Sequence, residues 1–414
     1  MKLLFISLNY FPDLTGIGKF NGEMVSWLVE QGHDICFISA PPYYPEWRVS
    51  SGYSAISYKL EKSRNLKVMR CPIWVPSKPS GVARILHLLS FALSSFPVVF
   101  WQLIKRPDVV FLTEPPFFCA PVVSALSKLL RVKSILHVQD LEIDAAFDLG
   151  IVRQKWVRWA IHRIESTTMR LFDIVSSISG PMLDKIRQKG LSDEKLFLFP
   201  NWVDIDQIHP LAGQIPLRQS LGIKEDSIVA LYSGNMGEKQ GLEIIIEAAR
   251  QIKDDRLMFV MCGNGSAYEN LYKRAQGLKN VKWLALQPVE KLNELLNMAD
   301  IHLLPQRSDV TDLVMPSKLT GIMASGKPCL ATAQPGTQVW DVLQDCGIVT
   351  APENQVEFNQ ALDILINNKS LRILYGENAR KYAVENFEKC KILQQFQNKL
   401  GDMVRSNTKR IRTH

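Results

Sequence analysis

A lysine in a glycine-rich loop offers the clearest candidate chemistry in this sequence. The segment YSGNMGEKQGLE (232–243) leads from an apolar, strand-like run into a helix-like run, and its glycines allow a tight loop. Lys239 lies just before the expected helix start near Gly241. A helix N-terminus contributes about half a positive charge, so the helix and the lysine together suit a diphosphate leaving group. The alternative is an ordinary lysine on a solvated loop.

A second glycine-rich turn, CGNG (262–265), follows the next strand-like run and adds backbone donors. An ordinary turn is again the alternative. Together the two loops predict an anion-binding surface made of backbone amides, amide side chains and a lysine. Its candidate residues are Gly234, Asn235, Gly237, Lys239, Gly263 and Asn264.

The loop after the first strand-like run carries a weaker form of the same signal. Gly16 and Gly18 precede a helical pattern, and they are candidate donor contacts because they allow a ligand to approach the backbone closely. Tyr10 and Thr15 of this loop are candidate acceptor contacts. The full dinucleotide fingerprint is missing, and no acid ends the second strand-like run, which disfavours a dehydrogenase. An ordinary turn explains the two glycines about as well.

Carboxylates follow later strand-like runs. Asp140 is a candidate catalytic or acceptor-binding residue, and Glu114 is another acid at a strand end. His137 lies on an extended run whose neighbours alternate between faces, so it is either an acceptor contact or part of the core. Glu142 is a further candidate acceptor contact. Ion pairs with surface lysines are the alternative for Glu142 and Asp144.

The elements that must position these residues are buried strands alternating with helices. Such continuous apolar runs predict parallel sheets covered on both faces. The expected strands are 2–10, 32–40, 108–114, 134–140, 173–179, 227–235, 257–265, 281–287, 300–306 and 327–333.

The strands form two series that break at PNWVDIDQIHPLAGQIP (200–216). We therefore expect an α/β protein of two doubly wound, Rossmann-like domains facing a cleft. An acceptor domain spans 1–203 and a donor domain spans 204–387, and a C-terminal helix of about 388–414 packs back on the first. Ligands of such sheets lie beyond the carboxyl ends of the strands, so one substrate per domain is expected.

Several blocks resemble the family 4 GT-B glycosyltransferases. They are TGIGKFNGEMVSWLVEQGHDICFISAPP, VSSISGPMLDKI, FPNWVDIDQIHP, LYSGNMGEKQGLEIIIEA, DIHLLPQ and MASGKPCLATA, and they cover nearly the whole chain in order. The sequence is most similar to bacterial exopolysaccharide and O-antigen transferases, including colanic-acid and L-fucosamine-type enzymes.

The resemblance implies retaining, metal-independent transfer of a sugar, fucose or N-acetylfucosamine in type, from a nucleoside diphosphate sugar. It implies no cofactor, UDP in preference to GDP, and an acceptor saccharide linked to polyprenyl diphosphate. Two alternatives stay open: a nucleoside diphosphate sugar epimerase of the same shape, and a non-catalytic protein that binds a sugar or an anion.

The donor residues of the family carry over only in part. The donor lysine corresponds to Lys239, with Gln240 before the following glycine, and Asn235 stands where the family has an arginine. The paired glutamates of the family are absent, and Gly321 and Leu313 occupy their positions. We expect the replacing block to hold the ribose or phosphates. Its residues are Asp312, Pro316, Ser317, Lys318 and Leu319.

In the N-terminal half, Asp140 stands where the family has an aspartate, and Gln139 replaces its histidine. A front-face retaining mechanism needs no strong protein base, because the leaving diphosphate can take the proton of the acceptor.

Two segments favour a membrane surface. Residues 85–104 are largely apolar and contain no acid or base except His87, but Pro97 interrupts them and Ser90, Ser94, Ser95 and Gln102 dilute them, so a hairpin at the headgroups is expected. A spanning helix and a buried helix pair are the alternatives. Residues 153–165 combine tryptophans with cations, which also suit an anionic surface. These residues are Arg153, Lys155, Trp156, Arg158, Trp159 and Arg163.

Composition agrees with a globular protein that has anionic partners. The 414 residues are 46% hydrophobic and 22% charged, with a net charge of +8. The seven cysteines form no CxxC pair and suit a reducing compartment. The first apolar run is short and lacks a cleavage site, so we read a strand and expect a cytoplasmic protein, peripheral on the inner membrane. No nucleic-acid motif accompanies the charge.

Overall fold

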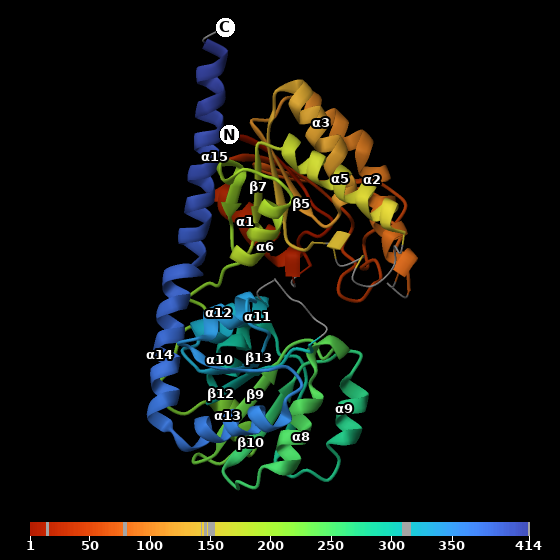
Figure 1. Cartoon of the computed structure of the whole chain (residues 1–414). Coiled ribbons are helices and arrows are strands. Elements are labelled where there is room, and N and C mark those ends of the chain that lie inside the picture. Colours follow the sequence, from red (N-terminus) through yellow and green to blue (C-terminus); the bar gives the residue numbers. More distant parts are fainter. Residues whose placement is uncertain are drawn as a thin grey trace. The chain divides into compact units, whose positions relative to one another are not determined.

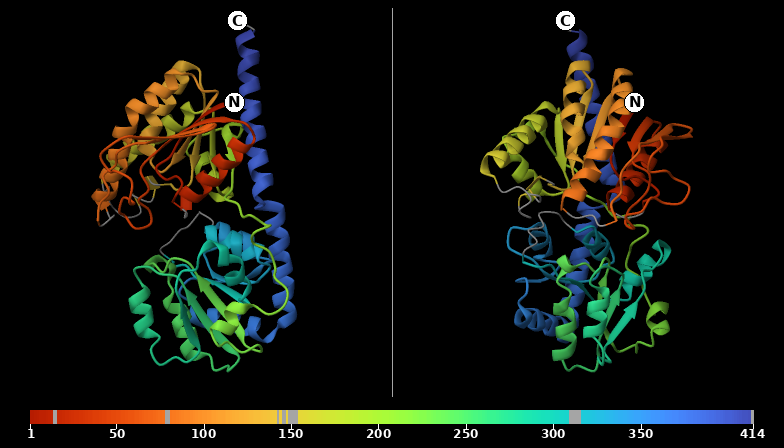
Figure 2. Two further views of the ribbon diagram at one scale, coloured as in Figure 1. Left: turned by 180° about the vertical axis from the view of Figure 1, so that it is seen from behind. Right: turned by 90° about the vertical axis from the view of Figure 1, so that its right-hand side faces the viewer.

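The computed structural model describes residues 1–13, 16–77, 81–141, 143–144, 147, 154–308 and 316–412, apart from the side chains of Lys239 and of residues 407–412. The chain divides into two compact units (Figures 1 and 2). The N-terminal unit comprises Met1–Pro200 with Leu393–His414, and the C-terminal unit comprises Asn201–Ile392. The domain limits expected from the sequence lie within a few residues of these boundaries.

The N-terminal unit is built on one sheet, which has eight strands among the described residues, in the order β3-β4-β2-β1-β5-β6-β7-β8. All neighbours pair in parallel except β3 and β4. The strands are β1 (Lys2–Ile6), β2 (Asp34–Ser39), β3 (Lys59–Ser63), β4 (Leu66–Arg70), β5 (Val109–Glu114), β6 (Lys133–Val138), β7 (Ile174–Ser177) and β8 (Leu196–Leu198).

Helices cover both faces of this sheet. Helices α2, α3 and α5 lie side by side on one face, and α15 lies on the other (Figures 1 and 2). The helices are α1 (Gly16–Glu30), α2 (Gly81–Ile104), η1 (Phe117–Cys119), α3 (Ala120–Leu130), α5 (Lys155–Leu171), α6 (Gly180–Gln188), η2 (Asp193–Lys195) and α15 (Lys389–Arg412).

The end of the chain completes the core that its beginning forms. Phe396 of α15 is fully buried, with its ring centroid 4.4 Å from that of Phe199 and 5.2 Å from that of Phe111. Aromatic pairs at these separations add to the burial of the rings themselves. The C-terminal helix therefore belongs to the N-terminal unit from residue 393 onward, as expected from the sequence.

The C-terminal unit is built on a parallel sheet of six strands within its described part, in the order β11-β10-β9-β12-β13-β14. The strands are β9 (Ile228–Ser233), β10 (Leu257–Cys262), β11 (Val281–Leu284), β12 (Ile301–Leu304), β13 (Cys329–Thr332) and β14 (Gly347–Thr350). The helices are α7 (Pro216–Ser220), η3 (Glu238–Gln240), α8 (Glu243–Gln251), α9 (Tyr268–Arg274), η4 (Val289–Lys291), α10 (Leu292–Asn297), α11 (Ser317–Ala324), α12 (Gln338–Leu343), α13 (Gln355–Asn367) and α14 (Lys369–Asn386).

One expectation about the elements is wrong. Residues 81–104 form a single helix, α2, that continues through Pro97 and is not a hairpin. Proline removes one backbone donor and leaves the carbonyl four residues earlier, that of Leu93, without its helical partner. Both residues are exposed, so water can satisfy this carbonyl.

Candidate functional site

The C-terminal unit has its topological switch point between β9 and β12. From β9 the chain proceeds to β10 and β11 on one side, and from β12 to β13 and β14 on the other. Ligands of doubly wound sheets bind beyond the carboxyl ends of the strands at such a point. The loop after β9 and helix α11, which follows β12 in the chain, are therefore the segments to inspect.

The two glycine-rich loops interlock through their backbones. The Gly234 amide donates to Cys262 at 2.9 Å, and the Met236 amide donates to Asn264 at 2.8 Å. Gly263 has φ +138°, and a Cβ there would lie 2.0 Å from the Gly234 carbonyl oxygen. Gly234 and Gly263 are therefore required for the two loops to approach, while the side chains of Asn235 and Asn264 remain exposed.

The lysine loop itself is a short 3-10 turn, η3, that ends at Gly241 with φ +58°. Helix α8 begins two residues later at Glu243, close to the expected start. A Cβ at Gly237 would lie 2.8 Å from the Gln240 Oε1, so this glycine keeps the turn tight. The side chain of Lys239 lies outside the described residues.

Lys318 brings a half-buried, poorly solvated positive charge onto the same loop. It follows the first residue of α11, and its Nζ donates to the Tyr232 hydroxyl at 3.0 Å. The Tyr232 hydroxyl in turn donates to the Asn235 carbonyl. A Cβ at Gly234 would lie 3.2 Å from the Lys318 Nζ. The structure thus joins the loop after β9 to the block expected to replace the glutamates of the family.

The electrostatics of Lys318 favour an anionic ligand. Within the described part of the chain, no carboxylate oxygen lies within 4.0 Å of its Nζ. Burial lowers the pKa of Lys318 to about 8, because desolvation disfavours the ammonium form. A buried cation without an anionic partner is costly, and a bound phosphate would remove that cost.

The other residues of this block are placed less completely. Pro316 precedes α11, Ser317 begins it with an exposed side chain, and Leu319 is fully buried in the core. Leu319 can therefore offer a ligand only its backbone. Asp312 lies outside the described residues.

A polar cavity of about 300 Å³ lies beside the lysine loop, between the start of α8 and the ends of β12 and β13. The Gln306 amide donates to the Thr332 Oγ1 at 2.8 Å, which fixes the backbone at its wall. The sequence analysis did not single out the residues that line this cavity, although the polar segment PQR (305–307) after an apolar run indicates a ligand-facing strand end. The cavity is lined by Gly241, Glu243, Ile244, Glu247, Arg274, Gln306, Arg307, Thr332, Glu353 and Gln355.

The N-terminal sheet has its switch point between β1 and β5, and a buried carboxyl lies beyond β1. Asp13 is 5% exposed, and the Asn9 Nδ2 donates to its Oδ2 at 3.1 Å. Burial raises the pKa of Asp13 to about 6. A Cβ at Gly18 would lie 2.5 Å from the Asp13 Cβ, so this glycine lets α1 pack against the loop. Sequence reasoning missed Asp13, because nothing in NYFPD shows burial.

Gly16 and Thr15 complete the account of this loop. Gly16 begins α1 with φ +55° and has open space where a Cβ would be. Thr15 lies outside the described residues.

Tyr10 is part of the core and not an open acceptor contact. Its side chain is buried, and its ring stacks on Phe37 at 4.0 Å between centroids. The Arg70 guanidinium carbon lies 5.5 Å from the centroid of the Tyr10 ring, and the Arg70 Nη2 lies 3.2 Å from the Glu61 Oε2. Burial raises the pKa of Tyr10 to about 12. The expectation that Tyr10 contacts the acceptor is therefore corrected: its side chain packs in the core beneath the loop that follows β1.

His137 also belongs to the core. One ring nitrogen is 2.9 Å from the Ser176 Oγ, and the other is 3.0 Å from the Gln139 Nε2. Burial lowers the pKa of His137 to about 3, so the ring is neutral. With both nitrogens engaged and 3% of the residue exposed, His137 cannot reach an acceptor. The core alternative holds.

Two carboxylates lie at neighbouring strand ends. Glu114 ends β5 and is buried, and β6 pairs with β5 so that Val138 is opposite Glu114. Asp140 follows two residues beyond Val138 and is half-buried. The structure therefore leaves Asp140 at the carboxyl edge of the sheet, where an acceptor contact was expected. Glu142 and Arg153 lie outside the described residues.

Asp144 is tied into an ion-pair network. The Lys189 Nζ lies 2.9 Å from an Asp144 oxygen and 2.6 Å from an oxygen of the buried Glu165. The His162 Nδ1 lies 3.3 Å from the other oxygen of Glu165. These three potential metal ligands, Asp144, His162 and Glu165, therefore already hold an internal cation. The ion-pair alternative for Asp144 is confirmed.

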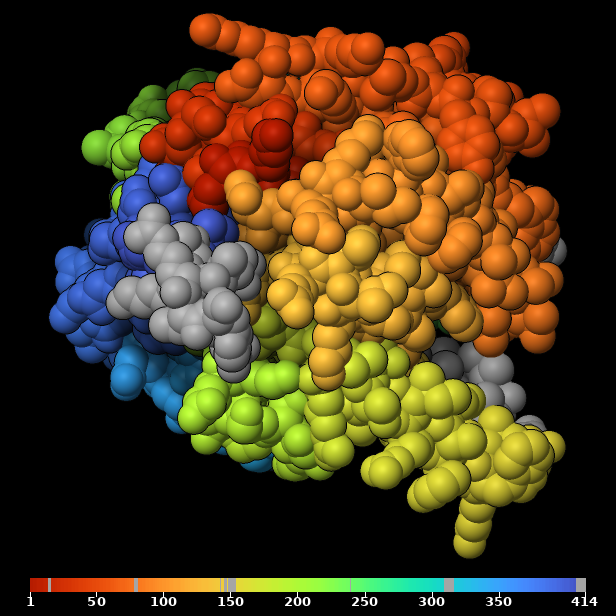
Figure 3. Space-filling view, turned by 90° about the horizontal axis from the view of Figure 1, so that it is seen from above, coloured from red at the N-terminus to blue at the C-terminus, as the bar shows by residue number. Residues whose placement is uncertain are grey.

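Helices α2, α3 and α5 carry exposed apolar side chains. Figure 3 shows a face of the molecule on which their orange to yellow segments are visible. Within the described part of the chain, α2 is the one helix long and apolar enough to cross a membrane by length and composition, and 28% of its apolar window is buried. On α5, Trp156 and Trp159 are 74% and 70% exposed. The exposed residues of α2 include Leu86, Leu93, Phe96, Phe100, Trp101 and Ile104.

Two family models match the chain. The Glycosyl transferases group 1 model matches residues 214–382, which include both glycine loops and Lys318. The Glycosyl transferase 4-like domain model matches residues 15–202. Each unit is therefore covered by a model of its own.

Among curated proteins, the chain is 40% identical over 408 residues to the colanic acid biosynthesis glycosyl transferase WcaI of Escherichia coli (strain K12). This similarity covers 96% of the chain and 99% of WcaI.

Solved structures share the fold at low identity. Sucrose-phosphate synthase from Thermosynechococcus elongatus has a TM-score of 0.73 at 15% identity and covers 98% of the chain and 99% of its own. Anabaena HepE in complex with UDP and glucose has a TM-score of 0.69 at 15% identity, over 97% and 100%.

Proposed function

The chain belongs to the group 1 glycosyltransferases of GT-B fold, and from this premise we propose that it transfers a sugar from a nucleoside diphosphate sugar to a lipid-linked saccharide in bacterial surface polysaccharide synthesis. The observation that carries this proposal is Lys318, a half-buried, poorly solvated ammonium without a carboxylate partner among the described residues, at the switch point of the C-terminal sheet. The name of the relative WcaI supports the pathway class.

The donor diphosphate is assigned to the loop after β9. The Lys318 ammonium lies against Gly234 and Tyr232 at the start of this loop, and η3 places Lys239 in the same loop. These groups favour charge on the oxygen that separates from the anomeric carbon, so they act where negative charge develops. Ser317 and Pro316 at the start of α11 adjoin Lys318 and complete the donor site.

The polar cavity beside the lysine loop is assigned to the ribose and base. We favour UDP over GDP, with support from the HepE structure, which contains UDP and glucose. Fucose or N-acetylfucosamine as the sugar rests on the resemblance alone.

The proposed reaction retains the anomeric configuration and uses no metal. The acceptor hydroxyl attacks from the face that the diphosphate leaves, and the departing phosphate oxygen takes the hydroxyl proton. The cations of the donor loop supply the charge that a metal would otherwise contribute. Asp140 and Asp13, at the carboxyl edge of the N-terminal sheet, are assigned to the acceptor sugar and act by orienting its hydroxyls.

The acceptor is proposed to be a saccharide on polyprenyl diphosphate, taken from the cytoplasmic face of the inner membrane. The exposed apolar side of α2 and the tryptophans of α5 support such a location, because aromatic side chains favour the headgroup region. Arg163 and Lys155 of α5 are exposed and add attraction to anionic lipid.

An incubation with a panel of nucleoside diphosphate sugars tests the proposal. One sugar should be transferred to a polyprenyl-diphosphate saccharide, and NMR of the product should show the anomeric configuration of the donor. Lys318→Met should abolish transfer, while Lys273→Met on the exposed side of α9 should not. Conversion of the donor into its epimer without any acceptor would instead support the epimerase alternative.

A further inference from the structure

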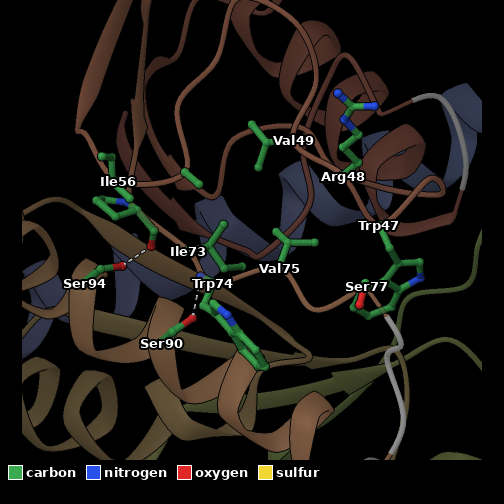
Figure 4. A pocket seen from close by; sticks show the side chains of 12 residues that line it. Trp47, Arg48, Val49, Ile56, Ile73, Trp74, Val75, Ser77, Ser90 and Ser94 are labelled. Atoms are coloured by element: carbon green, nitrogen blue, oxygen red, sulfur yellow. Dashed lines mark hydrogen bonds between the residues drawn. The ribbon is translucent and has the colours of Figure 1, made fainter.

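A cavity of about 690 Å³ opens in the N-terminal unit (Figure 4). It is walled by the segments that follow β2 and β4 and by helix α2. Because β1, β2 and β4 run parallel, these segments emerge at the same edge as Asp13. Tyr43 connects the two places. Burial raises the pKa of its hydroxyl, Asn9 and Asp13 also act on that pKa, and the His87 Nε2 lies 3.0 Å from the hydroxyl oxygen.

Apolar side chains dominate the wall of this cavity. They include Trp47, Ile56, Ile73 and Trp74, and the Trp47 ring packs 5.2 Å from the His87 ring. Trp74 is 49% exposed and Ile56 is 89% exposed, so much of this apolar surface faces the opening. Cavities of several hundred Å³ hold ligands of the size of a few isoprene units.

The hydroxyl groups that helix α2 contributes to the wall, those of Ser90 and Ser94, already bond to the protein. Ser90 donates to the His87 carbonyl at 2.7 Å and accepts from the Trp74 amide at 3.0 Å. Ser94 donates to the Pro72 carbonyl, and its own carbonyl accepts from the Tyr58 hydroxyl at 2.7 Å. A saccharide would need free hydrogen-bonding groups here, whereas a hydrocarbon chain would not. The lining therefore favours a hydrocarbon ligand.

Helix α2 links the cavity to the exposed apolar surface. At about 100° per residue, Ser90 and Ser94 fall between the buried stripe of α2 and its exposed stripe. The exposed stripe contains Leu86, Leu93 and Phe100. A chain that leaves the cavity past Ser90 would thus meet apolar surface and not a ring of charge.

The mouth of the cavity carries positive charge. Arg48 lines it and is exposed. Within the described part of the chain, no carboxylate lies within 4.0 Å of its guanidinium. A ligand with an apolar tail and a diphosphate head would match both the wall and the mouth.

We propose that this cavity binds the first isoprene units of the polyprenyl diphosphate that carries the acceptor saccharide, with Arg48 on the diphosphate. This assignment rests on the lipid-linked acceptor of the proposed function and adds the residues that recognise its lipid. Trp74 contacts the chain, and the saccharide extends from the diphosphate toward Asp13.

Calorimetric titration of the full-length protein with farnesyl diphosphate tests the assignment without any transfer reaction. The wild type should bind farnesyl diphosphate at least about tenfold more tightly than inorganic diphosphate. Trp74→Ala, or Ala55→Phe to fill the cavity, should remove most of this difference. Arg48→Gln should weaken both ligands.

Two controls separate the alternatives. Phe96→Ala, on the side of α2 that faces away from Ser90 and Ser94, should leave farnesyl diphosphate binding unchanged even if it reduces binding to phosphatidylglycerol vesicles. UDP titration should be unchanged in every variant, so that a failure here is distinct from a failure of the glycosyltransferase proposal. Equal binding of farnesyl diphosphate to wild type, Trp74→Ala and Ala55→Phe would overturn the assignment. So would an effect of the cavity variants on vesicle binding alone.

Discussion

At the scale of single residues, two poorly solvated ionisable groups mark the two proposed substrate sites. Desolvation disfavours the charged ammonium form of Lys318, and it likewise disfavours the charged carboxylate form of Asp13. Such groups reduce the stability of the free protein, and they gather at functional sites because a ligand or a reaction uses them. Each one has a pH dependence whose sign follows from the direction of its pKa.

Nucleotide affinity should fall as pH rises through about 8. Lys318 is charged below its pKa of about 8 and loses its proton above it, so its attraction for a diphosphate disappears there. Between pH 7 and 9.5 the dissociation constant of UDP should rise by about tenfold or more. In Lys318→Met the constant should start high and vary little over this range. A wild-type profile as flat as that of Lys318→Met would contradict the role of Lys318.

Asp13→Asn should stabilise the protein at neutral pH. The pKa of Asp13 is raised from its ordinary value of 3.8 to about 6, so the folded state binds more protons than the unfolded state between these pH values. Stability contributed by this group is therefore present at low pH and is lost as pH rises through 6. Denaturant unfolding should show a gain of about 1–3 kcal/mol for Asp13→Asn at pH 7.5 and little gain at pH 4. An equal change at both pH values would contradict the burial of a charged carboxylate.

At the scale of elements, apolar runs predict strands well and tertiary partners poorly. The expected strand 257–265 contains β10, and the expected strand 300–306 contains β12, because each run is buried on both faces. The charged edge strand β3, with the sequence KLEKS, has no apolar run to reveal it. Tyr10 was misassigned and His137 was left undecided, because a polar side chain near a strand end looks the same in sequence whether its ring is packed or open.

The donor loops were predictable because glycine spacing is a local signal, whereas the contact of Lys318 with Tyr232 joins residues 86 positions apart. The sequence singled out Lys318 as a replacement for missing glutamates, but only the fold shows that it is half-buried and poorly solvated. Asp13 and the cavity at Trp74 depend on burial, which no local pattern reveals.

Gly263→Ala should damage the donor site through its backbone. A Cβ at this position would lie 2.0 Å from the Gly234 carbonyl oxygen, and φ is +138°. We expect a loss of about 3 kcal/mol or more in stability, together with weaker UDP binding. Gly277→Ala is the matched control, because its φ is +85° but no atom lies within 4 Å of the added Cβ. Its cost should stay near 1 kcal/mol, and similar losses in both variants would argue against interlocked loops.

At the scale of the whole molecule, the chain builds two sheets and then returns to the first. The N-terminal unit includes Leu393–His414, so its core closes only when the last helix is present. A doubly wound unit for each substrate follows from this organisation, with the donor assigned to one sheet and the acceptor to the other.

Phe396→Ala should therefore destabilise the N-terminal unit. The ring is fully buried against Phe111 and Phe199, and its loss should cost about 3–5 kcal/mol. Gln394→Ala, an exposed position on the same helix, should change stability by less than about 0.5 kcal/mol. Thermal unfolding followed by tryptophan fluorescence measures both. No difference between the two variants would show that α15 does not hold this core together.

The most direct test of the donor assignment is a calorimetric titration of UDP into the wild type, Lys318→Met, Lys239→Met and the surface control Lys273→Met at pH 7. Removal of a charge-assisted contact to phosphate should weaken binding about tenfold to a hundredfold in Lys318→Met and in Lys239→Met. Lys273→Met should bind as the wild type does. UDP binding that is unchanged in Lys318→Met, with the wild type binding normally, would contradict the account.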